Sequence, residues 1–67
     1  MLMGPEFVVI VVKKYPESKD GTKTLYDYYD TKDEALQAKM KFIETDVNGD
    51  IIDIGIYRPA FVPVEED

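Results

Sequence analysis

Residues 7–12 form an unbroken apolar run, Phe-Val-Val-Ile-Val-Val, in which five of the six residues are β-branched. β-branched side chains fit a pleated strand and crowd a helix, so the run predicts a β-strand. A strand with one face in water alternates apolar and polar residues, whereas a continuous run is typical of a strand covered on both faces. A small chain can cover one face with its own helix. The other face then needs a partner subunit or a tail that folds back.

The size of the chain leads to the same expectation. With 67 residues it makes one domain, spanning residues 1–67. A chain of this length buries only about 60% of its unfolded surface and commonly relies on disulfides, metals or oligomerisation. It has no cysteine and no histidine, which excludes a disulfide and makes a structural zinc site very unfavourable. Oligomerisation remains, and we predict a homodimer.

The segment 22–29 is rich in Thr and Tyr, which favour strands, and residues 16–21 before it have the chemistry of a turn. The two strands should form an antiparallel hairpin with Tyr15 opposite Thr22. A slip of one residue would exchange the partners across the two strands. In this register one face carries Phe7, Val9, Val11, Tyr26 and Tyr28, and the other carries Val8, Ile10, Val12, Leu25, Asp27 and Tyr29.

A helix should follow over residues 32–47. Thr31 and Glu34 have the spacing of a capping box, and the acidic first turn suits the helix dipole. Asn48-Gly49 suits a left-handed residue after the last turn, although residues 47–50 also have the composition of a hairpin turn. The helical spacing favours the first interpretation, because apolar residues recur at Ala35, Leu36, Met40, Ile43 and Val47.

Residues 50–57 predict a third strand, in which Ile52, Ile54 and Ile56 alternate with other residues. A right-handed crossover from the second strand places this strand beside the first, with Ile54 under the helix. The predicted fold is α+β: a single ββαβ domain with a three-stranded antiparallel sheet of order 2-1-3 and one helix on one face. Residues 58–67 should be an extended arm or short edge strand followed by a solvated tail, because prolines interrupt them.

The sequence offers no complete catalytic or metal-binding motif. Asp46, Asn48 and Asp50 have the spacing that opens a calcium loop, but the glycine is misplaced and Tyr57 stands where the loop needs glutamate. We therefore expect a helix end and a turn there, and no tight metal binding. Without histidine, no serine or threonine has its usual activating base. The acidic cluster at Asp27, Asp30, Asp33 and Glu34 is attributed to helix capping and solubility. We predict no enzyme activity, no catalytic residues and no cofactor.

Charge and hydropathy restrict the partners and the compartment. Asp and Glu outnumber Lys and Arg by 14 to 8, giving a net charge of −6, which disfavours direct binding to nucleic acid. No apolar stretch approaches the roughly 20 residues of a membrane span. The start lacks the features of a signal peptide, so we expect a cytoplasmic protein. Residues 1–5 are expected to be disordered or not part of the native chain, since Met1 and Met3 both offer a start.

The tyrosines favour a protein-binding surface, since Tyr combines a large contact area with a polar tip. The sequence thus predicts a small acidic interaction module, such as an inhibitor, adaptor or accessory protein of bacteria or phages, that binds itself and another protein. The candidate interface is Phe7, Val9, Val11, Tyr26, Tyr28, Ile51, Tyr57, Phe61 and Val62. Three alternatives remain: an acidic mimic of nucleic acid, a single-strand binder with stacking tyrosines, and an enzyme or ligand-binding protein with a site between subunits.

Overall fold

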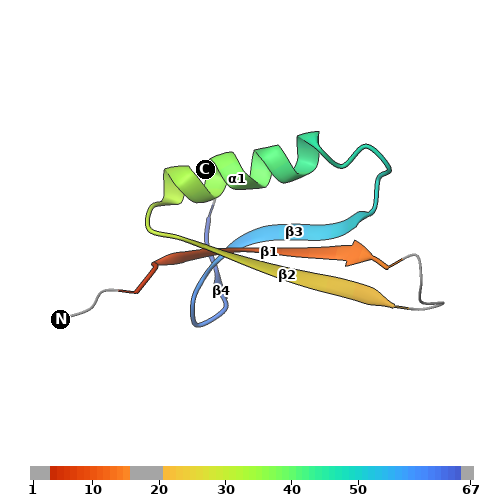
Figure 1. Ribbon diagram of the computed structural model, residues 1–67. Coiled ribbons are helices and arrows are strands. Elements are labelled where there is room, and N and C mark those ends of the chain that lie inside the picture. The colour runs from red at the N-terminus through yellow and green to blue at the C-terminus, as the bar shows by residue number, and fades with distance from the viewer. Residues whose placement is uncertain (1–3, 16–20, 66–67) are drawn as a thin grey trace.

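The computed structural model describes residues 4–15 and 21–65, which form a small α+β domain with one helix packed on one face of an antiparallel sheet (Figure 1). The predictions for the hairpin loop, the first residues and the last two residues lie wholly or partly outside the described residues. The elements are β1 Phe7–Lys14, β2 Thr22–Tyr29, α1 Lys32–Glu44, β3 Ile51–Arg58 and β4 Val62–Pro63.

The sheet has the strand order β2-β1-β3-β4. The prediction that the apolar first strand lies between the second and third strands is confirmed. The sheet has four strands rather than three, because Val62–Pro63 adds a short edge strand beside β3. Of the two predictions for residues 58–67, an extended arm or a short edge strand, the edge strand is therefore correct. The β3–β4 turn projects on the side of the sheet away from α1 (Figure 1).

The predicted hairpin register is wrong by one residue. Thr22 lies opposite Lys14 rather than Tyr15, and the N–H of Tyr15 donates to the carbonyl of Gly21 at 3.0 Å. Because strand side chains alternate between faces, this slip exchanges the faces of β2 relative to β1. Phe7, Val9 and Val11 therefore share a face with Leu25, Asp27 and Tyr29, while Val8, Ile10 and Val12 share the opposite face with Thr24, Tyr26 and Tyr28.

The helix begins as predicted but ends three residues early. The Thr31 hydroxyl accepts from the N–H of Glu34 at 3.2 Å, as in a capping box, and donates to the Glu34 carboxylate at 3.0 Å. Thr45 ends the helix, because its hydroxyl donates back to the carbonyl of Lys41 at 2.8 Å. Val47 lies outside the helix and is 88% exposed.

The core lies between α1 and the sheet. Its buried members are Phe7, Val9, Val11, Ala35 and Ile56, and Leu25, Tyr29, Leu36, Ala38, Phe42, Ile51, Ile54 and Val64 pack against them. The prediction that Ile54 lies on the helix side is confirmed. The predicted stripe of the helix is only partly correct, because Met40 and Ile43 are exposed while Ala38 and Phe42 pack inward. Ala38 and Phe42 continue from Ala35 with helical spacing as well, and this second stripe is the one that faces the sheet.

A bulge explains the start of β3. The register between β1 and β3 shifts between Val12 and Lys13, so that Asp53 pairs with Val12 and Ile51 pairs with Lys13. The extra residue changes the alternation. Ile51 consequently packs against the core, while Ile52, which the alternating pattern placed with Ile54, is 53% exposed. Within residues 4–15 and 21–65, no helix has the length and apolar character needed to cross a membrane.

Candidate functional site

The sheet face away from α1 carries four of the eight aromatic side chains of the sequence. We call it the tyrosine face and define it by Ile10, Tyr26, Tyr28, Tyr57 and Phe61. The first four follow from the strand pairing, since Ile10 pairs with Tyr26, and Val8 pairs with Tyr28 on one side and Tyr57 on the other. Tyr26 and Tyr28 are each 51% exposed. They stand side by side on an edge strand and are accessible to a partner.

Part of this face is covered from within the chain. Val8 has no exposed surface although it lies on the side without the helix, and it is flanked across the strands by Tyr28 and Tyr57. Gly55 leaves room for the Tyr57 side chain, because a Cβ at Gly55 would lie 3.1 Å from its ring. The apolar run is therefore covered on its second face at Val8 and only half-covered at Ile10 and Val12.

Phe61 completes the tyrosine face from the β3–β4 turn. Its ring centroid lies 6.1 Å from that of Tyr26, and the two planes are tilted by 56°. Its φ of 63° is in the left-handed region, where a bulky residue is strained. Its N–H donates to the carbonyl of Arg58 at 2.6 Å. The three-residue turn thus holds an aromatic ring over the sheet while leaving that ring 56% exposed.

The structure divides the predicted interface residues among three places. Tyr26, Tyr28, Tyr57 and Phe61 lie together on the tyrosine face. Phe7, Val9, Val11 and Ile51 instead belong to the core or pack against it under α1, because of the register slip and the bulge. Val62 pairs with Arg58 and is exposed at the sheet edge, on the helix side by strand alternation. An interface on this face therefore draws on a smaller set of residues than the sequence predicted.

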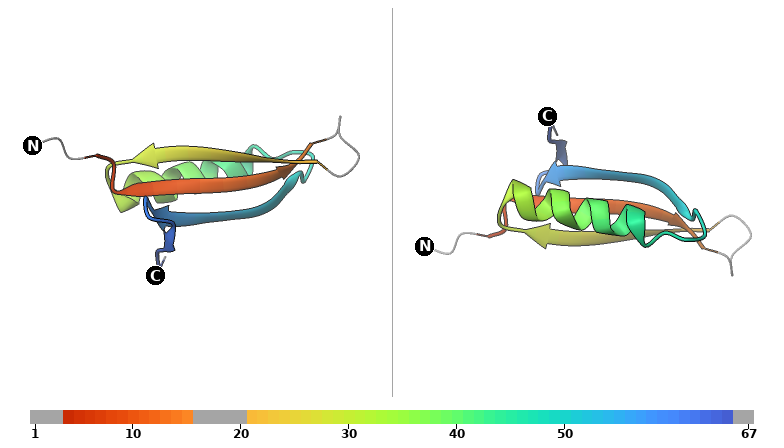
Figure 2. Two further views of the ribbon diagram at one scale, coloured as in Figure 1. Left: turned by 90° about the horizontal axis from the view of Figure 1, so that it is seen from below. Right: turned by 90° about the horizontal axis from the view of Figure 1, so that it is seen from above.

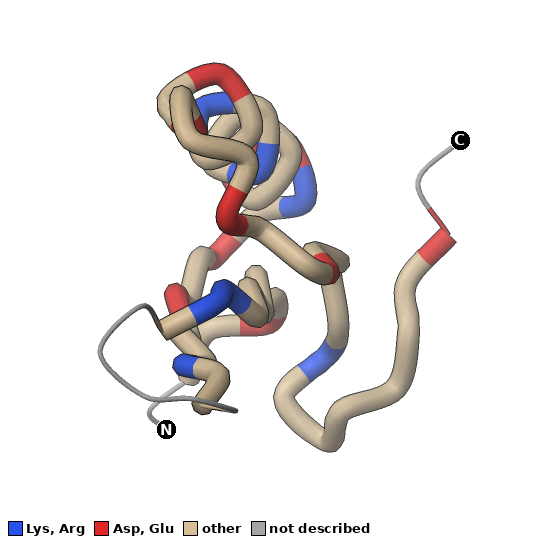
Figure 3. Tube along the Cα trace, turned by 90° about the vertical axis from the view of Figure 1, so that its right-hand side faces the viewer, with Lys and Arg blue, Asp and Glu red and all other residues tan. Residues whose placement is uncertain are grey.

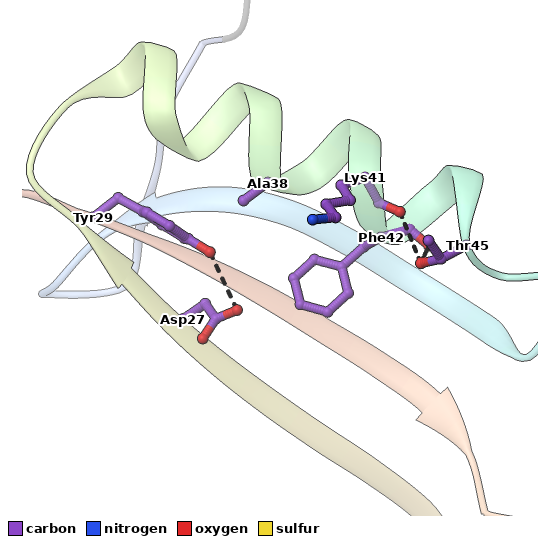
Figure 4. A pocket seen from close by; sticks show the side chains of 6 residues that line it. All are labelled: Asp27, Tyr29, Ala38, Lys41, Phe42 and Thr45. Carbon is purple, nitrogen blue, oxygen red and sulfur yellow. Dashed lines mark hydrogen bonds between the residues drawn. The ribbon is translucent and has the colours of Figure 1, made fainter.

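A shallow hollow of about 230 Å³ lies between β2 and α1 (Figure 4). Its lining is Asp27, Tyr29, Ala38, Lys41, Phe42 and Thr45. The Tyr29 hydroxyl donates to the Asp27 carboxylate at 3.2 Å. Burial raises the pKa of Tyr29 above its ordinary value of 10.0, and the negative charge of Asp27 raises it further. The sequence predicted no such hollow, although it placed Asp27 and Tyr29 together on the face opposite the candidate interface, because strand alternation alone does not show how α1 packs beside β2.

The chemistry of this hollow is limited. The Thr45 hydroxyl is occupied by its bond to the helix carbonyl, and a tyrosine with a raised pKa stays protonated at neutral pH. Asp27 faces a neutral hydroxyl. The lining thus offers one carboxylate, one ammonium at Lys41 and apolar surface. This combination suits contact with another protein better than bond making or breaking.

The Asp46 loop has a structural role. The two carboxylate oxygens of Asp46 accept from the N–H groups of Asp50 and Ile51, at 2.9 and 3.0 Å. The hydrogen bond from Ile51 lowers the pKa of Asp46 below its ordinary value of 3.8, with a further contribution from the bond from Asp50. Gly49 supplies the left-handed residue of the turn, with φ of 67°. The carboxylate that resembles a calcium ligand in the sequence therefore closes the turn before β3.

Charged residues are mixed over the molecule. Figure 3 shows acidic segments on the helix, the loops and the strands, interspersed with basic ones. The sequence also missed a contact at the end of the sheet, where the Arg58 guanidinium lies 5.4 Å from the centre of the Phe7 ring. An aromatic at the start of one strand and an arginine at the end of its neighbour could have suggested this pair.

Comparison with known proteins finds no protein family, no curated protein and no solved structure that matches the chain.

Proposed function

We propose that the protein is a small acidic, non-enzymatic interaction module that acts as a homodimer and binds another protein through the tyrosine face. The observation that carries this proposal is the grouping of Tyr26, Tyr28 and Phe61, each about half exposed, on one face of the sheet. Aromatic residues of this kind dominate the energetics of protein interfaces, since they bury a large area with little loss of side-chain entropy.

The position of these side chains on regular structure supports the same proposal. Tyr26 and Tyr28 stand on a regular strand, and the strained turn fixes the position of Phe61. A preorganised surface loses less conformational entropy on binding than a flexible one. The net charge of −6 favours a partner with a basic surface around an apolar centre. A cytoplasmic location remains part of the proposal.

The test is a capture experiment with three tagged proteins: the wild type, Tyr26→Ser and the control Ile43→Ser. Ile43 is exposed to the same extent as Tyr26 but lies on the helix, so both variants remove a comparable apolar surface. We expect a partner from host extract to bind the wild type and Ile43→Ser, and to lose affinity for Tyr26→Ser. Circular dichroism verifies that both variants are folded. Equal capture by Tyr26→Ser and the wild type would contradict the proposal.

A further inference from the structure

The outer edge of β2 is unpaired along its whole length. β2 is the terminal strand of the sheet, and no segment of residues 4–15 or 21–65 pairs with its outer side. Figure 2 shows the strand running along the border of the sheet, beside the helix rather than beneath another element. A long edge strand with free backbone groups is a template for pairing with another strand.

One hydrogen bond identifies the free backbone groups. The N–H of Tyr15 donates to Gly21, so Tyr15 and Gly21 form a hydrogen-bonded pair. In an antiparallel ladder such pairs alternate with non-hydrogen-bonded pairs, whose N–H and C=O groups point away from the partner strand. The odd-numbered residues of β2 therefore bond to β1. The even-numbered residues turn their N–H and C=O groups outward, and these are Thr22, Thr24, Tyr26 and Tyr28.

The opposite edge of the sheet is covered only in part, because β4 lies beside the end of β3 and no described segment pairs with the outer side of residues 51–55. β4 has two residues, and one of them is Pro63. The N–H of Val64 donates to the carbonyl of Ile56, so the residues on either side of Pro63 bond inward to β3 and Pro63 faces outward. Proline has no N–H to offer a further strand. Pro63 thus blocks extension at β4, and the open part of β3 is short and begins at a bulge, whereas β2 is open over eight consecutive residues.

The side chains of β2 are self-complementary about Leu25. Lys23, Leu25 and Asp27 alternate on the helix side of the strand. When two copies of β2 lie antiparallel with Leu25 opposite its counterpart, each Lys23 lies opposite the Asp27 of the other copy. Opposite charges directly across a strand pair stabilise it, whereas like charges destabilise it. A twofold axis makes this contact twice, because the same patch is used by both copies.

Neighbouring registers lack this match. Only the even-numbered residues have outward N–H and C=O groups, so one strand can shift along the other only in steps of two residues. One step in either direction places Leu25 opposite Lys23 or opposite Asp27. Both shifts bring an apolar side chain against a charge and leave the other charge without its counterpart. The β2 strand also carries one basic and one acidic residue, so it is locally neutral in a chain of net charge −6.

We infer that two copies of the chain pair through their β2 edges, with Leu25 at the twofold axis and two Lys23–Asp27 contacts between subunits. This inference specifies the interface of the homodimer in the proposed function and rests on that dimer. Asp27 lines the hollow beside α1, so the Lys23 side chain of the other copy would come to the mouth of that hollow. The tyrosine faces of the two copies then lie side by side on one surface, open to a partner.

Complementary charge reversals test the register. Lys23→Glu places two acids opposite each other across the strand pair, and Asp27→Lys places two bases there. Each variant alone should dimerise at least about tenfold more weakly than the wild type by sedimentation. An equimolar mixture should recover the dimer as a heterodimer, because the introduced glutamate then faces the introduced lysine, and the remaining native Asp27 faces the remaining native Lys23. Lys32→Glu and Asp53→Lys, which make the same charge changes away from β2, should leave the dimer intact.

A single cysteine provides a second test. The chain has no cysteine, and Leu25 would sit in a non-hydrogen-bonded pair, where Cα atoms lie about 4.5 Å apart, within the range of disulfides. Leu25→Cys should therefore give a covalent dimer on mild oxidation, while Ile52→Cys should not. If Leu25→Cys does not crosslink and neither charge reversal weakens the dimer, the inference of β2 pairing is wrong, whereas the proposal of a homodimer stands. A wild type that is monomeric at high micromolar concentration would overturn both, and capture through the tyrosine face would still be judged separately.

Discussion

Phe61 combines a strained backbone conformation with an aromatic contact. It occupies a left-handed conformation, in the turn position that three-residue hairpins usually give to glycine. A non-glycine residue loses roughly 1–2 kcal/mol in this conformation. An aromatic pair such as Phe61 with Tyr26 returns about 0.5–1.5 kcal/mol. The two effects are of similar size, so folding alone gives little reason for phenylalanine at this position.

Comparing Phe61→Ala with Phe61→Gly measures this strain. Alanine removes the ring and keeps the strain, whereas glycine removes both. We expect Phe61→Gly to be more stable than Phe61→Ala by about 1 kcal/mol, and close to the wild type, in urea denaturation. Equal stability of the two variants would show that the turn is not strained at this residue.

Asp46 supports a second prediction, through pH. Its pKa is lowered in the folded state, so its contribution to stability is present above pH 3.8 and is lost as the pH falls through the folded pKa. Asp46→Asn removes one acceptor charge and cannot titrate. We expect the melting temperature of Asp46→Asn to lie below that of the wild type at pH 6, and the difference to shrink toward pH 2. Asp53→Asn, at an exposed strand position, is the control and should show a smaller difference at pH 6.

At the scale of elements, the sequence predicted more than it did for individual contacts. The strand over 22–29, the helix start at Thr31 and the central position of β1 follow from propensity, capping and crossover handedness, which act locally or through topology. The register of the hairpin depends on the geometry of its turn, which composition does not determine. That one slip put Val8, Ile10 and Val12, rather than Phe7, Val9 and Val11, on the tyrosine face.

The two faces of the sheet give a prediction for matched substitutions in neighbouring strands. Ile56 is 2% exposed under the helix, whereas Ile10 is only partly buried on the tyrosine face. Ile56→Ala should lose about 2–5 kcal/mol of unfolding free energy, as buried isoleucines do. Ile10→Ala should lose less than this, because water already reaches its side chain. An equal loss for Ile10→Ala would mean that Ile10 is more fully buried in solution than the structure of the single chain shows.

At the scale of the whole molecule, the two edges of the sheet make different contributions. The β4 end packs Val64 against the core and carries Phe61, while the β2 end is left open. A chain that stops after Arg58 should therefore be less stable, since it loses an apolar contact and an edge strand. Because β2 is unchanged, the truncated chain should still dimerise by sedimentation. A chain that stops after Glu65 is the control and should match the wild type in both measurements.

Pro63 has a consequence for how far assembly can proceed. A sheet with two open ends can add copies at both, and its growth has no natural stop. Pro63 blocks a further strand at β4, so under the inferred β2 pairing only the short, bulged part of β3 stays open. In the inferred pairing, growth of a fibre is therefore disfavoured, because bulged and short edges are poor templates for a further strand. An acidic chain with an exposed strand would in this way favour a finite assembly over a filament.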